Sequence, residues 1–387
     1  MKNTTNESYD SNQSRREFLK LLGVGTATIS LLGISGCFAE QQTLRLSSSG
    51  TLDIGAANWK NVEKLLNIKL QFTDNGNDTG PVLANMINGN AAYDFDISGL
   101  QGGIERELAL ANKILPWDTS KIPLLKESWD WVKNIPHCFI NGKQYGLPVI
   151  INADSVIYLP DEVGYKVDSY EVLFNPKFKG RVAMEDSWIN SVIFTAIYLK
   201  ENSLLPINIP GDLTETELGG VMEFMIKKKK EGQFKTFWKG WEDGLRLIRN
   251  KEVIAMTGWE PIQIEAKKSG INCEYAVCKE GYEGWTNDMV LHVGSEKKGL
   301  VDIAHKFVNW QLSGFYGCVM SEEKGYIVPN NLAVDYAKTD KRYNPDLIQS
   351  KIQHVKDKFL SNKVYWQNTR PKNYKLYEDW WTKLRNI

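Results

Sequence analysis

The feature that most constrains the fold is an alternation of strand-like and helix-like segments that starts near residue 44. Apolar residues recur with a period of two over 44–46 and again over 68–72, as in half-buried strands. The apolar residues of 62–66 between them have helical spacing. Strand, helix and strand within roughly 30 residues predict a βαβ unit and a parallel sheet. Further strands are predicted over 93–98, 144–151, 181–184 and 253–256.

The length of 387 residues predicts two folded units of ordinary domain size. Together with the alternation, it predicts an α/β chain made of two doubly wound lobes. In such sheets a ligand binds in a crevice beyond the carboxyl ends of the strands. The site is therefore expected between or beside these strand ends.

The charge balance argues against a nucleic-acid partner. The chain has 47 basic and 47 acidic side chains, so it lacks the basic excess of a nucleic-acid binder. The run Lys227–Lys230 is predicted to lie in the last turn of a helix, where it favours the helix dipole. Thr214 and Glu217 form a capping box at the predicted start of that helix.

The first 37 residues have the layout of a signal peptide. The segment Ser14-Arg15-Arg16-Glu17-Phe18-Leu19-Lys20 resembles a twin-arginine export signal, and the weakly apolar stretch 21–34 follows it. That stretch is too short to span a bilayer, which needs about 20 apolar residues. Ile34-Ser35-Gly36-Cys37 resembles a lipobox. We expect export by the twin-arginine translocase and lipid anchoring at Cys37, in the periplasm or on the outer face of the membrane; the alternative is an ordinary cleavage site.

Cysteine and histidine residues give no sign of a metal or catalytic site. The spacing of the later cysteines matches no metal motif, and their pairing into disulfides stays open beside the alternative of free buried thiols. The four histidines are isolated, and the sequence has neither a G-x-S-x-G elbow nor a P-loop. No enzymatic activity, cofactor or metal is therefore expected. The residues concerned are Cys138, Cys273, Cys278 and Cys318, and His137, His292, His305 and His354.

Four segments, in order along the chain, resemble family 1 solute-binding proteins of ABC transporters. Residues 142–149 (GKQYGLPV) resemble the family's crossing between lobes. Residues 173–183 (LFNPKFKGRVA), 325–330 (GYIVPN) and 366–368 (WQN) are similar to segments of the spermidine/putrescine-binding branch. The resemblance implies a type II periplasmic binding protein fold, in which two lobes close on one solute and deliver it to permease subunits. It implies lobe 1 at 42–150 plus 288–332, and lobe 2 at 151–287 plus 333–387.

The resemblance also implies a set of solute-binding residues. It places two tryptophans, Trp259 and Trp285, across the cleft from each other, where they stack on the ligand. An acid from the pair Glu185 and Asp186 would face an ammonium group, with Asp186 the stronger candidate. Further ligand contacts are expected from Tyr326, Gln367, Ser98 and Asn287, and from Ser48 and Ser49.

Several positions depart from the polyamine-binding pattern. Asn287 and Ile189 stand where that branch has acids, and a serine-rich segment that includes Ser48 and Ser49 replaces an aromatic cluster. Hydroxyl and backbone N–H donors suit an anionic group better than an ammonium group. We therefore expect a small amine-containing, polyamine-like solute, but with weak affinity for polyamines. The alternatives are an anionic or zwitterionic solute, ferric ion, or, less favoured, a secreted enzyme.

Overall fold

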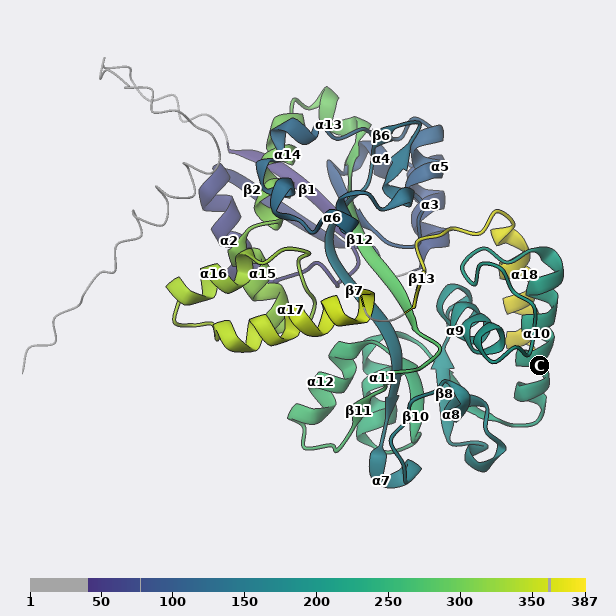
Figure 1. Ribbon diagram of the computed structural model, residues 1–387. Helices are drawn as coiled ribbons and strands as arrows, with labels where there is room; N and C mark the ends of the chain where they lie inside the picture. Colours follow the sequence, from purple (N-terminus) through teal and green to yellow (C-terminus); the bar gives the residue numbers. More distant parts are fainter. Residues whose placement is uncertain (1–40, 77, 361–362) are drawn as a thin grey trace, which may run out of the picture.

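The computed structural model describes residues 41–76, 78–360 and 363–387, and the signal-peptide residues lie outside this range. It has two lobes joined by two long, fully buried strands, β7 (Leu147–Tyr158) and β12 (Tyr282–His292) (Figure 1). These two strands are antiparallel, and residues 147–154 pair with residues 283–289. β7 then continues into the second lobe, so the two sheets share this strand and hydrogen bonding runs from one lobe to the other.

The strand order across both lobes is β2-β1-β3-β12-β7-β10-β8-β9. In the first lobe β1 is parallel to β2 and β3, whereas β12 is antiparallel to β3. In the second lobe β8 is parallel to β9 and β10, whereas β10 is antiparallel to β7. The strands are β1 Gln42–Ser48, β2 Ile68–Asp74, β3 Ile97–Leu100, β4 Ile114–Leu115, β5 Phe139–Ile140, β6 Lys143–Gln144, β8 Val182–Glu185, β9 Phe234–Trp238, β10 Ala255–Gly258, β11 Glu274–Tyr275 and β13 Val364–Trp366.

The helices cover both faces of the sheets, as expected of an α/β architecture. Figure 1 shows α14 and α2 beside the first sheet and α11 and α12 beside the second. The helices are α2 Gly55–Leu66, α3 Thr79–Asn88, α4 Ala91–Asp94, α5 Glu105–Leu110, α6 Asp130–Lys133, α7 Pro160–Val163, α8 Glu171–Phe174, α9 Trp188–Glu201, α10 Glu215–Lys230, α11 Gly240–Arg249, α12 Glu260–Lys268, α13 Val293–Lys297, α14 Val301–Gln311, α15 Gly314–Val319, α16 Leu332–Thr339, α17 Pro345–Leu360 and α18 Tyr374–Arg385, with short helices η1 Thr119–Lys121, η2 Pro123–Glu127, η3 Pro136–Cys138, η4 Pro176–Phe178 and η5 Met320–Lys324.

Most of the predicted strands are present, with shifted bounds. The first two strands and their parallel pairing are confirmed. The segment 93–98 is wrong as a single strand, because it contains the end of α4 and only the start of β3. The strand predicted at 144–151 is only the beginning of β7. Residues beyond 151 continue it because they pair first with β12 and then with β10.

Two large cores mark the two lobes. One core gathers β1 and α2 with α14 and α15, and the other gathers β8, α9 and α10 with α18. The C-terminal residues divide between them. α16 and α17 pack with Cys318 of α15 and with Ile151, whereas α18 packs on α9 and α10. Of the residues 333–387 that were expected in lobe 2, those of α18 and Tyr365 pack with the lobe 2 core.

Local chemistry explains the ends of α10. Thr214 and Glu217 form both hydrogen bonds of the predicted capping box, and Lys227–Lys230 occupy the last turn as expected. The four cysteines from Cys138 onward are buried and free, which is the second of the two alternatives left open by the sequence.

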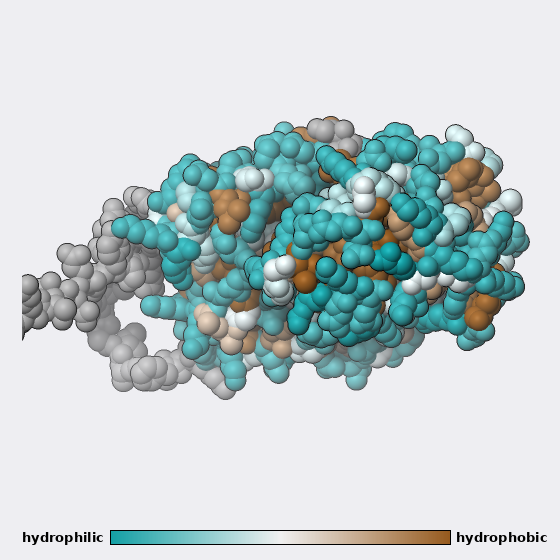
Figure 2. Space-filling view, turned by 90° about the horizontal axis from the view of Figure 1, so that it is seen from below, coloured by the Kyte–Doolittle hydropathy of each residue, from teal (hydrophilic) through white to brown (hydrophobic). Residues whose placement is uncertain are grey.

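The surface is mostly polar. Figure 2 shows a largely hydrophilic face on which hydrophobic residues form separate patches. Isolated exposed apolar residues are normal on a soluble domain. Within the described ranges, no helix combines the length and apolarity that crossing a bilayer would require.

Candidate functional site

A cavity lies where β7 and β12 pass between the lobes, and its free volume is about 60 Å³. One wall comes from the first lobe and carries hydroxyl and amide groups. The opposite wall comes from the second lobe and the crossing strands, and it carries carboxylates and aromatic rings. The lining residues are Thr51, Thr79, Gln101, Gly102, Asp154, Glu185, Ser187, Ile189, Asn190, Trp259, Trp285, Tyr326 and Gln367.

Asp154 is the charged group at the centre of the crossing strands. It lies in β7, in which every residue is buried. The indole Nε1 of Trp285 donates a hydrogen bond to its Oδ2 at 2.8 Å, and Tyr275 Oη lies 3.2 Å from its Oδ1. Burial raises the pKa of Asp154 to about 7, although the Lys358 ammonium opposes this shift. The carboxyl is therefore poised to change its charge near neutral pH.

Glu185, at the end of β8, is the second carboxylate of the cavity. Asn190 Nδ2 donates to its Oε2 at 2.7 Å, and Gln367 Nε2 donates to Asn190 Oδ1 at 2.6 Å. Burial raises the pKa of Glu185 to about 7, against the hydrogen bond from Asn190. The relay Gln367–Asn190–Glu185 fixes the orientation of this carboxylate at the first turn of α9.

Glu283 lies behind the cavity wall. It pairs directly with Asp154 across β7 and β12, so the two side chains share one face of the sheet. Both of its carboxylate oxygens are buried without a hydrogen-bond partner. Burial, followed by the proximity of Asp154 and Glu185, raises the pKa of Glu283 well above its ordinary value. Asp154, Glu185 and Glu283 thus form one cluster of buried acids.

A fourth acid, Glu260, has a resident cation. Lys358 Nζ of α17 lies 2.8 Å from Glu260 Oε2 and also donates to Asn152 Oδ1 and to the carbonyl of Ala153. His354 Nε2 is 3.0 Å from the other oxygen of Glu260. Burial alone would raise the pKa of Glu260, but Lys358 and His354 hold it below its ordinary value. Lys358 therefore links α17 to the first turn of α12, next to Trp259.

Aromatic rings complete the walls. Trp285 and Tyr326 pack edge to face, with ring centroids 5.1 Å apart. Trp259 makes the same kind of contact with Trp238, which is fully buried. Such packing fixes the ring orientation, and a ring held beside a carboxylate suits a cationic group.

Comparison with known proteins identifies the family. The profile of the bacterial extracellular solute-binding proteins matches residues 61–341, which is most of the chain. The chain belongs to this family. The cavity between the lobes is thus the candidate solute site.

Solved structures share the fold of this solute-binding protein. A Listeria monocytogenes protein described as a spermidine/putrescine ABC transporter has a TM-score of 0.73 at 20% identity, with 89% of this chain and 99% of that chain covered. The substrate-binding protein PotD of Streptococcus pneumoniae has a TM-score of 0.67 at 15% identity, with the same coverage. MotA of A. tumefaciens, in complex with glucopine, has a TM-score of 0.66 at 15% identity, with 89% of this chain and 100% of that chain covered. The likeness supports the two-lobed type II binding-protein fold.

Five of the residues that the resemblance implies lie together in the cavity of this solute-binding protein. They are Trp259, Trp285, Tyr326, Gln367 and Glu185. Ser49 lines an adjoining small cavity and donates to Thr51. Their contact with a solute stays a prediction.

Other implied residues are placed away from the cavity lining. Asp186 Oδ1 accepts hydrogen bonds from Trp381 Nε1 at 2.9 Å and Arg385 Nε at 2.7 Å. Ser98 bonds His292, and burial lowers the pKa of that imidazole to about 4. Ser48 donates to the carbonyl of Gly99, and Asn287 is fully buried. The expected acid is therefore at the cavity, but it is Glu185 rather than its neighbour Asp186.

The sequence reasoning missed Asp154 and Glu283. Asp154 interrupts a mostly apolar strand, where an acid is costly and therefore informative, whereas Glu283 lies in a strand with several polar residues. That signal was present in the sequence, but it does not say that the two strands pair side by side.

Proposed function

We propose that this protein is the extracytoplasmic solute-binding component of an ABC importer, and that its solute carries a protonated amino group. In this proposal the lobes close on the solute and present it to permease subunits. The protein binds the solute without changing it. The proposal rests on the family and on the charges of the cavity.

The supporting observation is that, among the described residues, the cavity acids have no direct ion pair, although Lys358 Nζ bonds the carbonyl of Ala153, next to Asp154. In the part of the chain that the structure describes, no salt bridge joins Asp154, Glu185 or Glu283 to a basic side chain. Leaving a buried carboxylate ionised and unpaired costs several kcal/mol. An ammonium group between Asp154 and Glu185 would supply the missing positive charge and hydrogen-bond donors.

The surroundings of these acids fit an alkylammonium group. Trp285, Tyr326 and Trp259 offer apolar and aromatic surface for methylene groups, while the two carboxylates face the charged end. Spermidine/putrescine proteins and a glucopine complex occur among proteins of this fold. Polyamine-like solutes are therefore the first class to test, and Asp154 replaces one of the acids that the sequence seemed to lack.

A zwitterionic solute is the second candidate. The wall from the first lobe carries Thr51, Thr79 and Gln101, which are neutral donors suited to a carboxylate or hydroxyl group. Such a solute would place its ammonium group at Asp154 and Glu185 and its anionic group at this wall. An opine or an amino acid has this layout.

The test begins with mass spectrometry of any solute that co-purifies with the protein. Isothermal titration calorimetry then compares putrescine and spermidine with GABA and an opine, and the solute is recovered to check that it is unchanged. Tight binding of an amine, lost in Asp154→Asn, supports the proposal. Preferred binding of a dianion, with no effect of Asp154→Asn, would refute the amine assignment.

We also propose that Arg15 and Arg16 direct export through the twin-arginine translocase and that Cys37 carries the lipid anchor. These residues lie outside the described part of the structure, and the proposal rests on their sequence context. Replacing both arginines by lysine should retain precursor in the cytoplasm. Cys37→Ala should release the protein from the membrane; unchanged membrane association in fractionation would contradict the anchor.

A further inference from the structure

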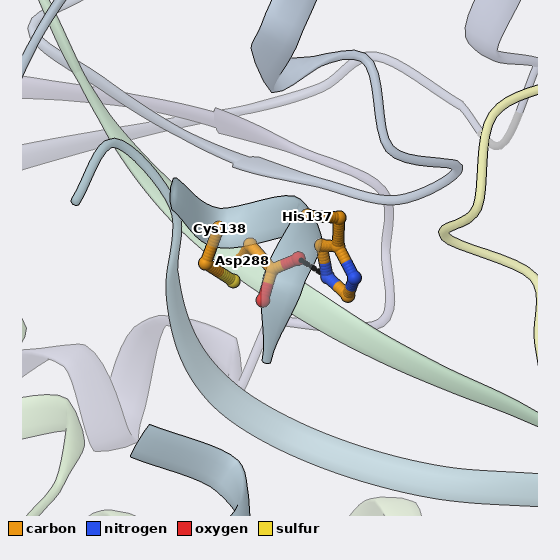
Figure 3. Close-up of side chains that lie close together, drawn as sticks. All are labelled: His137, Cys138 and Asp288. Carbon is orange, nitrogen blue, oxygen red and sulfur yellow. Dashed lines mark hydrogen bonds and ion pairs between the residues drawn. The ribbon is translucent and has the colours of Figure 1, made fainter. Parts of the chain in front are cut away.

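A second buried cluster, at the first-lobe end of β12, lies apart from the solute cavity. His137 and Cys138 come from η3 and Asp288 from β12, and one potential ligand atom of each lies within 4.8 Å of the others. Figure 3 shows the three side chains converging, with the carboxylate of Asp288 between the imidazole and the thiol. None of the three lines the solute cavity.

The two oxygens of Asp288 have different surroundings. Oδ2 accepts hydrogen bonds from Thr286 at 2.9 Å and Asn368 at 3.4 Å, and it lies 2.9 Å from His137 Nε2. Oδ1 is buried and has no hydrogen-bond partner. The carboxylate is thus held through Oδ2, and it also contacts the Cys138 thiol and the Glu105 carboxyl.

Glu105, the first residue of α5, is a second observation that points to a ligand. Its side chain is fully buried, and apart from a contact with the Asp288 carboxylate its carboxyl group has no hydrogen-bond partner in the described part of the chain. A Cβ placed on Gly146 would meet Asp288 Cβ and Cys138 Sγ at 3.3 Å and Glu105 Cγ at 3.4 Å. The three side chains therefore surround one point of the backbone, and Glu105 belongs to the same cluster.

The carboxyl groups of Asp288 and Glu105 share a buried site with a thiol and an imidazole, and negative charge held there without a cation is costly. A divalent cation would supply the positive charge that this cluster lacks.

We propose that Cys138, His137 and Asp288 bind one Zn²⁺ ion, with Glu105 beside Asp288 as a supporting group. Thiolate, imidazole and carboxylate are the ligand types that Zn²⁺ takes in four-coordinate protein sites. A thiolate with an imidazole also disfavours Ca²⁺ and Mg²⁺, which take oxygen ligands. Zn²⁺ displaces the thiol proton and any carboxyl proton into solvent, so binding strengthens as the pH rises.

The position of the cluster gives the ion a structural role. It would tie α5 and η3 to β12 at the register shift between Asn287 and Asp288, where β12 enters the first lobe. The ion would then anchor the base of a crossing strand. It would take no part in contacting the solute.

The test uses the untagged full chain, stripped of metal with a chelator and dialysed. Zn²⁺ is titrated in competition with a chromophoric chelator, and Co²⁺ is added separately to record thiolate-to-metal absorption in the near ultraviolet. We expect one equivalent of Zn²⁺, a Co²⁺–thiolate band, and weaker binding of Ca²⁺. Glu105→Gln should weaken Zn²⁺ binding at least about tenfold, by analogy with the loss of groups that support metal sites.

Matched cysteine variants decide the assignment. Cys138→Ser should remove the Co²⁺–thiolate band. Cys318→Ser should keep it, because Cys318 is a buried free thiol of α15 that donates to the carbonyl of Ala333, which a serine hydroxyl can also do. Circular dichroism checks that both variants fold. Absence of Zn²⁺ binding by the stripped native chain, or equal Zn²⁺ and Co²⁺ behaviour of Cys138→Ser and Cys318→Ser, would overturn the proposal.

Discussion

The buried acids beside the crossing strands differ in how their charge is balanced. Glu260 has basic partners within the chain, whereas Asp154 and Glu185 have none in direct contact among the described residues. Glu260 has Lys358 and His354 against its two oxygens, and its pKa lies below the ordinary value. Asp154 and Glu185 have neutral donors instead, and burial raises the pKa of each to about 7. Of these acids, only Asp154 and Glu185 line the cavity. The contrast shows that the fold can place a cation beside a buried acid, and under the proposed function the solute supplies this cation at the cavity.

The largest effect on stability is expected from removal of Lys358, the cation that balances Glu260. Lys358→Met should lower the free energy of unfolding by about 3–5 kcal/mol, because it leaves Glu260 buried without its main cation. Urea unfolding measures the loss. Lys356→Met, on the same helix but with its ammonium exposed near Trp129, should cost less than about 1 kcal/mol. Equal losses of stability in the two variants would mean that burial does not increase the contribution of the Lys358–Glu260 pair to the free energy of unfolding.

Removing a cavity acid should weaken solute binding rather than the fold. Asp154→Asn should lower the affinity for an amine about a hundredfold, because it removes the partner of a buried charge while keeping the shape. The matched control is Asp186→Asn. That acid neighbours Glu185 in sequence but pairs with Arg385, whose side chain is 50% exposed. Calorimetry should show that this control binds the solute with an affinity within about twofold of the native protein. A large loss of affinity would indicate that Asp186 takes part in solute binding.

The pH dependence of binding sharpens the same contrast. As pH falls through 7, Asp154 and Glu185 take up protons in the free protein, whereas a bound ammonium group keeps the carboxylates ionised. Binding is then linked to proton release, and affinity should fall by up to about tenfold per pH unit below 7 for each carboxylate. Calorimetry at pH 8, 7 and 6 measures this. A solute affinity that does not change with pH would show that Asp154 and Glu185 are not ionised in the complex.

The smallest effect is expected behind the cavity wall. The pKa of Glu283 is raised in the folded protein, so it lowers stability progressively as pH rises above its unfolded value. Glu283→Gln removes this penalty and should raise the free energy of unfolding at pH 8 by about 1–2 kcal/mol, with little change at pH 4. Urea unfolding at both pH values gives the comparison. Destabilisation at pH 8 would indicate that the carboxylate has a partner.

The sequence by itself determined the alternation of strands and helices, and hence the α/β class. Local rules act over a few residues, so the parallel pairing of the first two strands and the capping box at Thr214 and Glu217 were predictable. The family resemblance also led to Trp259, Trp285, Tyr326 and Gln367, which the fold brings to one cavity.

Only the tertiary structure decided which acids share an environment. Glu185 and Asp186 are neighbours in sequence, yet one faces the cavity and the other faces Arg385, because successive residues at a strand end point to opposite sides. Asp154 and Glu283 are 129 residues apart and lie opposite each other through the register of β7 and β12. The cluster of Glu105, His137, Cys138 and Asp288 likewise exists only after folding, since its members come from three separate segments. Charge, burial and pKa depend on such distant neighbours, and a linear sequence does not specify these distances.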